Sequence, residues 1–204
     1  MSDLQCAAVV LVARHAEAAY DVPVVLGDEG GRLTDRGREQ ALALAAELHG
    51  RRVAAVCSSH LSRAVETAEV VAGALGVDAH VLPGLEEFSV GTLAGRADGE
   101  AEVERVFESW LCGDLGPGCP GAESGFQVVE RFRTAVGEVA DSFRGETVLL
   151  VSHGGIMSIA LPRIAFDAHD DIARARWVPH CGMAEVHVDS DGWSLTSWPG
   201  RLEP

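Results

Sequence analysis

The sequence predicts a three-layer α/β/α domain with a mainly parallel sheet and an antiparallel edge strand or C-terminal hairpin. Three apolar runs rich in β-branched residues, at residues 7–13, 53–57 and 147–151, have the length and composition of buried strands. Each is followed by a segment with helical periodicity, and such alternation implies a parallel sheet with helices on both faces. Because the chain has 204 residues and no linker or repeat, we expect residues 1–204 to form a single domain.

Amphipathic periodicity predicts a helix after each buried run and two more helices between the second and third runs. Thr34 or Asp35 can cap the first helix and Ser124 the fourth, because their side-chain oxygens can accept a free backbone N–H. Gly76 suits the left-handed position that ends the second helix. The expected helices span residues 35–49, 61–75, 96–111, 124–143 and 156–165.

The remaining segments are expected to form short strands and loops. Residues 78–82 predict a short strand, and residues 17–34 a loop of about twenty residues. Residues 111–122 are rich in Gly, Pro and Cys, which favours a second loop. Apolar segments at residues 182–188 and 193–198, separated by Asp-Ser-Asp-Gly, predict the C-terminal hairpin.

Ionisable side chains follow all three buried runs. Arg14 and His15 follow the first, Arg63 lies one turn into the helix after the second, and His153 and Gly154 follow the third. In an open α/β sheet, ligands bind outside the carboxyl ends of the strands. If the strands are parallel neighbours, two guanidinium groups and two imidazoles converge there, a set that suits a phosphoryl group.

Charge and hydropathy exclude several classes of partner. The net charge of −15 argues against binding to nucleic acid and to an anionic membrane surface. No apolar run approaches the ~20 residues that a membrane span needs, and no secretory signal pattern is present, so we expect a cytoplasmic protein. Dimerisation is compatible with the sequence, which gives no clear interface.

Metal, disulfide and lysine chemistry are not expected. The five cysteines are scattered, and no pair has the spacing of a zinc site. The chain contains no lysine, which excludes a Schiff base and a P-loop lysine. We therefore expect neither a metal nor a cofactor. The cysteines are Cys6, Cys57, Cys112, Cys119 and Cys181.

Five segments, in order along the chain, resemble the signature motifs of the histidine phosphatase superfamily, the phosphoglycerate-mutase-like group. The Arg-His-Gly-Glu motif of the superfamily corresponds to Arg-His-Ala-Glu at residues 14–17. Its other motifs correspond to residues 33–41, 58–68, 85–95 and 152–155, the last of which reads Ser-His-Gly-Gly. Five matches in the order of the family are hard to reach by chance.

The resemblance implies a reaction and a role for each site residue. His15 would attack phosphorus and form a phosphohistidine, while Arg14, Arg63, His153 and Gly154 would bind the phosphoryl group. Alignment with the family makes Glu87 the proton donor; the adjacent Glu86 is the alternative, because the choice depends on register. The substrate would be a small-molecule phosphate ester.

The resemblance also implies a lid, formed by residues 96–125 over the site. This segment is short compared with that of the mutases in the family, which favours a phosphatase, because a mutase must hold its intermediate and exclude water. Three positions depart from the first motif: Ala16 replaces its glycine, Ala18 a Thr or Ser, and Asp21 an asparagine that contacts the phosphoryl group. A carboxylate at residue 21 would repel a phosphate dianion.

Cys57 is an alternative candidate for the nucleophile, because residues 57–63 satisfy the Cys-x5-Arg pattern of cysteine-dependent phosphatases at a strand-to-helix turn. That reading leaves Arg14, His15 and His153 unexplained. Three further functions are compatible with the motif that contains Arg14 and His15. They are a phosphohistidine protein phosphatase, a phosphoglycerate-mutase-type transferase and a non-catalytic phosphoester-binding module. Glu17 can either contact the site or face solvent, and His180 is the loop histidine most worth locating.

Overall fold

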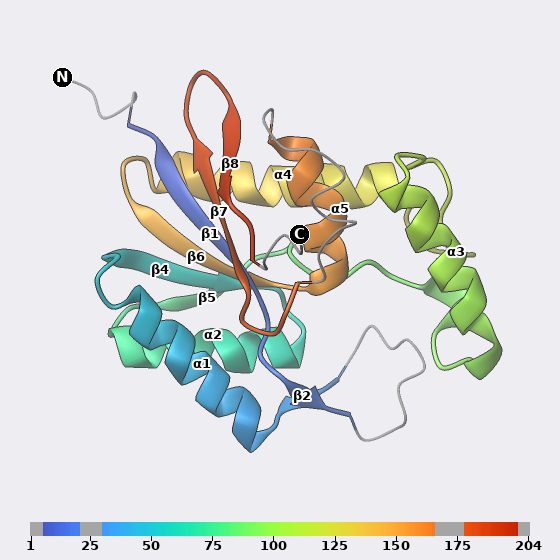
Figure 1. Ribbon diagram of the computed structural model, residues 1–204, viewed down its shortest axis with the longest axis horizontal. Helices are drawn as coiled ribbons and strands as arrows, with labels where there is room; N and C mark the ends of the chain where they lie inside the picture. The colour runs from blue at the N-terminus through green and yellow to red at the C-terminus, as the bar shows by residue number, and fades with distance from the viewer. Residues whose placement is uncertain (1–5, 21–29, 166–177, 200–204) are drawn as a thin grey trace, which may run out of the picture.

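The computed structural model describes residues 6–20, 30–165 and 178–199 and contains a six-stranded sheet between two layers of helices (Figure 1). The strand order is β5-β4-β6-β1-β7-β8. The first four of these strands are parallel, and β7 and β8 are antiparallel at one edge, which confirms the predicted fold class. The strands of this sheet are β1 (Ala8–Arg14), β4 (Val53–Ser58), β5 (Ala79–Val81), β6 (Thr147–Ser152), β7 (Met183–Val188) and β8 (Trp193–Ser197).

The five α-helices of the described residues lie close to their predicted spans. Thr34 caps the first helix by accepting the N–H of Gly37, and Ser124 forms a reciprocal capping box with Gln127 at the fourth. Gly76 ends the second helix in the left-handed conformation, with φ at 70°. The helices are α1 (Asp35–Leu48), α2 (Ser62–Leu75), α3 (Glu100–Leu111), α4 (Gly125–Ser142) and α5 (Gly154–Ile164).

The side chains of β1 show how the sheet divides two hydrophobic cores. Val10 and Val12 point into the core that α3, α4 and α5 share, whereas Leu11 and Ala13 point into the core beneath α1 and α2. The alternation follows from the pleat, since successive side chains of a strand lie on opposite faces. Both faces are buried, which explains why the strand is apolar at each position from Ala8 to Ala13 and not at every second one.

The carboxyl ends of β4, β6 and β1 meet because β6 lies between the other two strands. Arg14 pairs with Ser152, and Ser58 with Val151. The next residues continue the ladder: the N–H of His15 donates to Ser152 at 2.9 Å, and the N–H of Ser59 donates to Val151 at 3.1 Å. The residues that follow the three strands therefore lie side by side.

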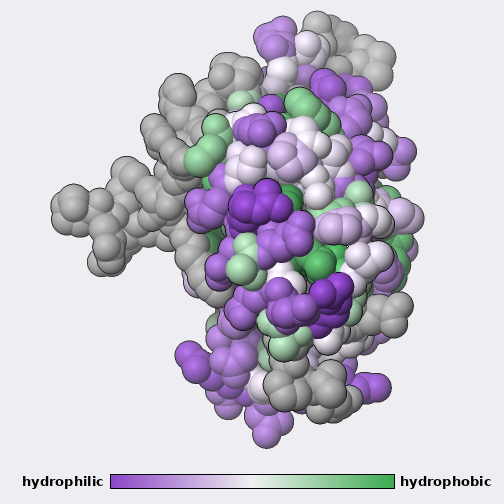
Figure 2. Space-filling view, turned by 90° about the vertical axis from the view of Figure 1, so that its right-hand side faces the viewer, coloured by the Kyte–Doolittle hydropathy of each residue, from purple (hydrophilic) through white to green (hydrophobic). Residues whose placement is uncertain are grey.

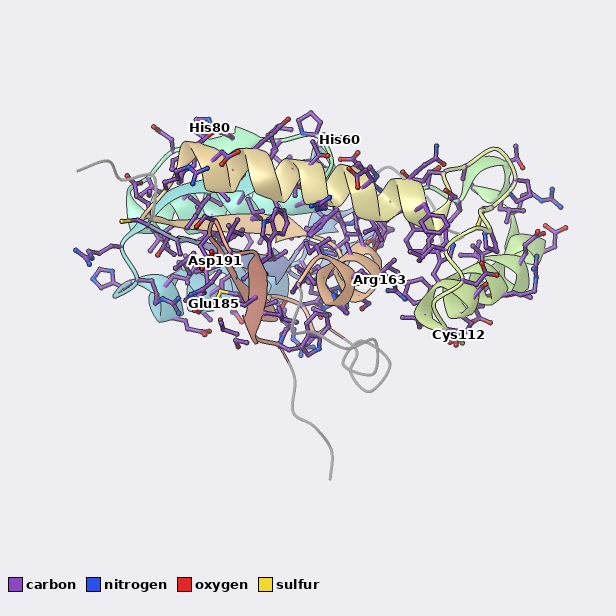
Figure 3. The ribbon with its side chains drawn as sticks, turned by 90° about the horizontal axis from the view of Figure 1, so that it is seen from above. His60, His80, Cys112, Arg163, Glu185 and Asp191 are labelled. Carbon is purple, nitrogen blue, oxygen red and sulfur yellow. The ribbon has the colours of Figure 1, made fainter. Side chains whose placement is uncertain are left out.

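α3 stands beside this end of the sheet, at the right of Figure 1. Its buried residues include Trp110, whose indole N–H donates to the carbonyl of Pro117 at 2.8 Å. Arg163 projects from α5 and donates to the carbonyl of Trp110, and Figure 3 shows Arg163 on the side of the molecule that carries α3 and Cys112. That residues 96–125 form a lid over the site stays a prediction.

One expectation about secondary structure was wrong. Residues 17–34 were expected to be a loop, but β2 (Ala18–Ala19) pairs with β3 (Arg32–Leu33) in a separate two-stranded ribbon. Strands of two residues are too short to show any hydropathy period, so the sequence cannot reveal them. Among the described helices, none combines the length and the hydropathy needed to cross a bilayer.

Candidate active site

A cavity of about 630 Å³ opens at the carboxyl ends of the parallel strands, between the sheet and α3. One wall carries most of the residues that the sequence placed in the site. A second wall comes from α3 and from Phe88. The first wall comprises Arg14, His15, Arg63, Glu87, Gly154 and Gly155, and the second includes Phe88, Glu100, Val103, Glu104, Phe107 and Leu111.

His15 is held in one tautomer by its own backbone. Its Nδ1 lies 2.8 Å from the carbonyl oxygen of Ala16, which can only accept, so Nδ1 carries the proton and Nε2 keeps a lone pair. The residue is 5% exposed, and burial lowers the pKa of its imidazole from 6.5 to about 3, with Arg63 and Arg14 adding to the effect. A neutral imidazole with a free Nε2 is the form in which histidine acts as a nucleophile.

Thr67 ties this loop to α2. Its hydroxyl donates to the carbonyl of Arg63 at 2.7 Å and accepts the N–H of Ala16 at 3.1 Å. Because Ala16 in turn fixes the ring of His15, the helix that carries Arg63 also sets the position of the imidazole. Thr67 belongs to the motif match at residues 58–68 but was not predicted as a site residue, since a threonine within a helix gives no local signal of such a contact.

His153 lies against His15. The ring centroids are 5.1 Å apart, with 54° between the ring planes. The Nε2 atom of His153 is 2.7 Å from the Ser59 hydroxyl, and among the described residues nothing hydrogen-bonds to its Nδ1, although the side chain is buried. His153 lies behind His15 and is not among the residues that line the cavity. Burial together with nearby cations holds the pKa of His153 well below 6.5.

Two arginines face the cavity beside the imidazoles. Arg14 donates to the carbonyl of Val178 at 2.9 Å, and Arg63, which is 5% exposed, donates to Gly30 at 3.1 Å. Within the described part of the chain the Nε of Arg63 has no hydrogen-bond partner, and no ion pair joins the guanidinium to a carboxylate. A buried guanidinium group with an N–H bond to spare, as in Arg63, is suited to an oxyanion.

Glu87 is bound by the start of α5. Its carboxylate accepts the N–H of Gly155 at 2.9 Å and that of Ile156 at 2.7 Å. Burial raises the pKa of this carboxyl, against the opposing effect of these backbone N–H groups and of Arg63. A Cβ at residue 155 would lie 2.7 Å from Glu87 Oε1, so glycine is needed there for the carboxylate to approach.

Glu86 points elsewhere, although it is the next residue. It accepts the N–H of Gly84 at 2.8 Å and lies 3.7 Å from Arg131 and 3.9 Å from His60. Arg131 also donates to the carbonyls of Gly84 and Glu86, and so holds the loop that carries Glu87. The structure therefore places Glu87, and not Glu86, at the cavity, a distinction that register alone left open.

Comparison with known proteins shows the family of the chain. Residues 10–199 match the family model described as histidine phosphatase superfamily, branch 1. The chain belongs to that superfamily. A relative from Escherichia fergusonii named "Probable phosphoglycerate mutase GpmB" is 28% identical over 192 residues, covering 93% of this chain and 89% of the relative. An Arabidopsis thaliana relative named metal-independent phosphoserine phosphatase is 29% identical over 197 residues, covering 93% and 80%.

Solved structures show the same fold. A mycobacterial glucosyl-3-phosphoglycerate phosphatase has a TM-score of 0.79 and 24% identity, covering 96% of this chain and 100% of that one. The α-ribazole phosphatase from Shigella flexneri has a TM-score of 0.73 and 22% identity, covering 96% and 98%. At these identities the likeness establishes the fold alone. The family predicted from the sequence motifs is confirmed by the family model.

The departures from the family motif fall at different places in this histidine phosphatase. Ala16 is fully buried, and its methyl group joins the core beneath α1 and α2. Ala18 lies in β2, and Asp21 lies outside the described residues. Glu17 was expected either to contact the site or to face solvent. Its carboxylate instead accepts a hydrogen bond from the Thr34 hydroxyl at 2.9 Å and lies 3.4 Å from Arg36.

Cys57 does not have the environment of a nucleophile. It is a buried residue of β4, it packs in the core shared by α3, α4 and α5, and burial raises the pKa of its thiol. A reactive cysteine needs a lowered pKa and access to substrate. The histidine phosphatase therefore offers His15, and not Cys57, at the cavity.

His180 lies closer to the site than a loop position suggests. Its ring centroid is 5.7 Å from that of His15, on the segment whose Cys181 N–H donates to the carbonyl of Arg14 at 3.0 Å. Burial lowers the pKa of its imidazole, and Arg14 adds to this effect. By contrast, His60 and His80 lie at the outer edge of the molecule (Figure 3).

We expect acid to destabilise the fold through His15 and His153. An unfolded histidine has a pKa near 6.5, whereas His15 has a pKa of about 3 in the fold. Below pH ~6.5 the unfolded chain therefore binds more protons than the native state, so the free energy of unfolding falls with the pH, by up to about 1.4 kcal/mol per pH unit for each such histidine. Urea unfolding between about pH 7 and about pH 4 measures this slope.

The matched variants are His15→Gln and His49→Gln. His49 is exposed at the end of α1, so its replacement should leave the slope unchanged, whereas His15→Gln should reduce it by about one proton. An identical slope in both variants and the parent protein would show that His15 is not held neutral by the fold.

Proposed function

We propose that this histidine phosphatase is a metal-independent phosphomonoester hydrolase that acts on a small phosphorylated metabolite through a phosphohistidine on His15, with Glu87 as the proton donor. One observation carries the proposal: a neutral His15, fixed by Ala16, shares a single cavity with Arg14, Arg63 and Glu87. A nucleophile, an oxyanion cradle and an acid within one cavity are the parts that phosphoryl transfer requires.

In the first step, the Nε2 lone pair of His15 attacks phosphorus and the bond from phosphorus to the ester oxygen breaks. The departing oxygen takes a proton from the carboxyl group of Glu87. In this proposal Arg14, Arg63, His153 and Gly154 bind the phosphoryl group. Cations aimed at these oxygens offset the charge that builds up in the transition state.

In the second step, water attacks the phosphohistidine. Glu87, now a carboxylate, accepts a proton from the water as its oxygen bonds to phosphorus. The bond from phosphorus to nitrogen breaks, its electron pair returns to Nε2 of His15, and inorganic phosphate leaves. The enzyme is then restored, with Glu87 protonated and His15 neutral, and no metal takes part.

The short segment over residues 96–125 favours hydrolysis over mutase activity, because a mutase must exclude water while its intermediate is held. The two steps require no metal ion, because Arg14 and Arg63 supply the positive charge that offsets the phosphoryl oxygens.

We expect the purified protein to release phosphate from para-nitrophenyl phosphate with EDTA present, and to hydrolyse 3-phosphoglycerate faster than it isomerises it. A malachite-green assay measures hydrolysis, and phosphorus NMR of the glycerate products measures isomerisation. Isomerisation faster than hydrolysis would favour a mutase, and binding of phosphate without turnover of any ester would favour a binding module. Turnover of a phosphohistidine protein alone would favour the protein phosphatase.

A further inference from the structure

The wall that α3 contributes to the cavity is acidic. Glu100 and Glu104 lie one helical turn apart and both line the cavity. Neither carboxylate forms an ion pair or hydrogen bond within the described residues, whereas the neighbouring Glu102 lies 3.3 Å from Arg105. Two unpaired carboxylates therefore face the same space as the buried, partly unpaired guanidinium of Arg63.

The same wall is also aromatic. Phe88 and Phe107 both line the cavity and stack with ring centroids 5.5 Å apart and 16° between planes. Trp110 packs edge-on against Phe88 at 5.1 Å. Figure 2 shows the molecule from the side on which α3 lies, with hydrophobic areas in green among hydrophilic side chains in purple. Aromatic faces attract an ammonium group through the ring quadrupole, and nearby carboxylates attract it through their charge.

The cavity thus has two poles of opposite charge. The phosphate dianion belongs at the pole of Arg14 and Arg63, so the alcohol part of the ester extends toward α3. A cavity of about 630 Å³ is large enough for a leaving group well beyond the phosphoryl group itself. A carboxylate in that leaving group would be repelled by Glu100 and Glu104, and a cation there would be attracted.

We propose that the preferred substrate is the phosphate monoester of an amino alcohol or basic ring alcohol with an apolar frame, whose ammonium group is recognised by Glu100, Glu104 and the aromatic wall. This inference rests on the proposed phosphatase activity and names its substrate class. Carboxylated esters such as phosphoglycerates are disfavoured by the same wall.

Three aryl phosphates of nearly equal size test the inference: 4-(aminomethyl)phenyl, 4-(hydroxymethyl)phenyl and 4-(carboxymethyl)phenyl phosphate. The methylene group separates each charge from the ring, so the three leaving groups differ little in intrinsic reactivity. We expect kcat/KM for the ammonium ester to exceed that for the carboxylate ester by at least about tenfold at low salt. The ratio should shrink in about 0.5 M NaCl, because salt screens partly exposed charges.

The variants are the double substitution Glu100→Gln and Glu104→Gln, and the matched control Glu108→Gln. Glu108 is an exposed residue of the same helix that does not line the cavity. The double variant should reduce the preference to about twofold or less while hydrolysis of the neutral ester stays within about twofold, and the control should leave the preference intact.

The outcomes separate this inference from the activity on which it rests. Equal turnover of all three esters, or a preference that survives in the double variant, would overturn the inference and leave the phosphatase intact. Failure of all three esters and of para-nitrophenyl phosphate would overturn the phosphatase proposal itself. Faster turnover of the carboxylate ester would reverse the assignment of the acidic wall.

Discussion

Replacement of His15 by alanine is expected to abolish phosphate release, with kcat on para-nitrophenyl phosphate falling by at least ~10⁴-fold. The reason is geometric: His15 is the residue in the cavity whose lone pair is fixed toward open space, since Nδ1 is engaged by the carbonyl of Ala16. Steady-state release of nitrophenol measures the loss, and circular dichroism checks that the variant is folded.

Trapping the phosphoenzyme tests the same assignment of the nucleophile without measuring a rate. The native protein, mixed briefly with a ³²P-labelled ester and denatured in alkali, should retain label that acid removes, as a phosphohistidine does. His15→Ala should retain none. Cys57→Ala should keep both label and activity, because Cys57 lies in the core. Label that survives in His15→Ala but vanishes in Cys57→Ala would overturn the assignment of the nucleophile.

Replacement of Glu87 by glutamine is expected to lower steady-state turnover by about 10²- to 10⁴-fold and to change its time course. With para-nitrophenyl phosphate, the first step needs little help from an acid, because nitrophenolate is a good leaving group. The second step loses its base, so one equivalent of nitrophenol should appear in a burst before slow turnover. Rapid-mixing absorbance measures the burst, and the phosphoenzyme should accumulate.

An alkyl phosphate should be more sensitive to Glu87→Gln than an aryl phosphate, because an alkoxide cannot leave without a proton. The matched control is Glu86→Gln, which alters contacts with Arg131 and His60 outside the cavity and should change turnover by less than about threefold. A loss confined to Glu86→Gln would return the proton donor to the neighbouring residue. The glutamine also leaves one N–H of α5 without its acceptor, so a stability loss of about 1–3 kcal/mol is expected.

The sequence predicted the carboxyl ends of three strands well, because an apolar run that stops at Arg14 or His153 marks both the strand and the edge where ligands bind. The same reasoning predicted the C-terminal hairpin, since its turn residues are distinctive. These signals are local, so a single chain is enough to read them.

The parts that the sequence missed depend on contacts between distant segments. In the sequence, Glu100 and Glu104 look like residues of an ordinary solvated helix face. Only the structure shows that they line the same cavity as Arg63. His180 was singled out as the loop histidine to locate, but nothing near it in the chain indicates that it neighbours His15. The separation of Glu86 from Glu87 likewise depends on where α5 begins, which tertiary packing decides.

The attachment of α3 has a consequence for how such a protein can change. The helix is joined to the domain through Trp110 and Arg163, on the opposite side of the sheet from the Thr67 link that orients His15. Substitutions at the exposed Glu100 and Glu104 of α3 can therefore alter what the protein accepts without disturbing the machinery that breaks the ester. A library randomised at these two positions would be expected to yield new substrate preferences more often than inactive proteins.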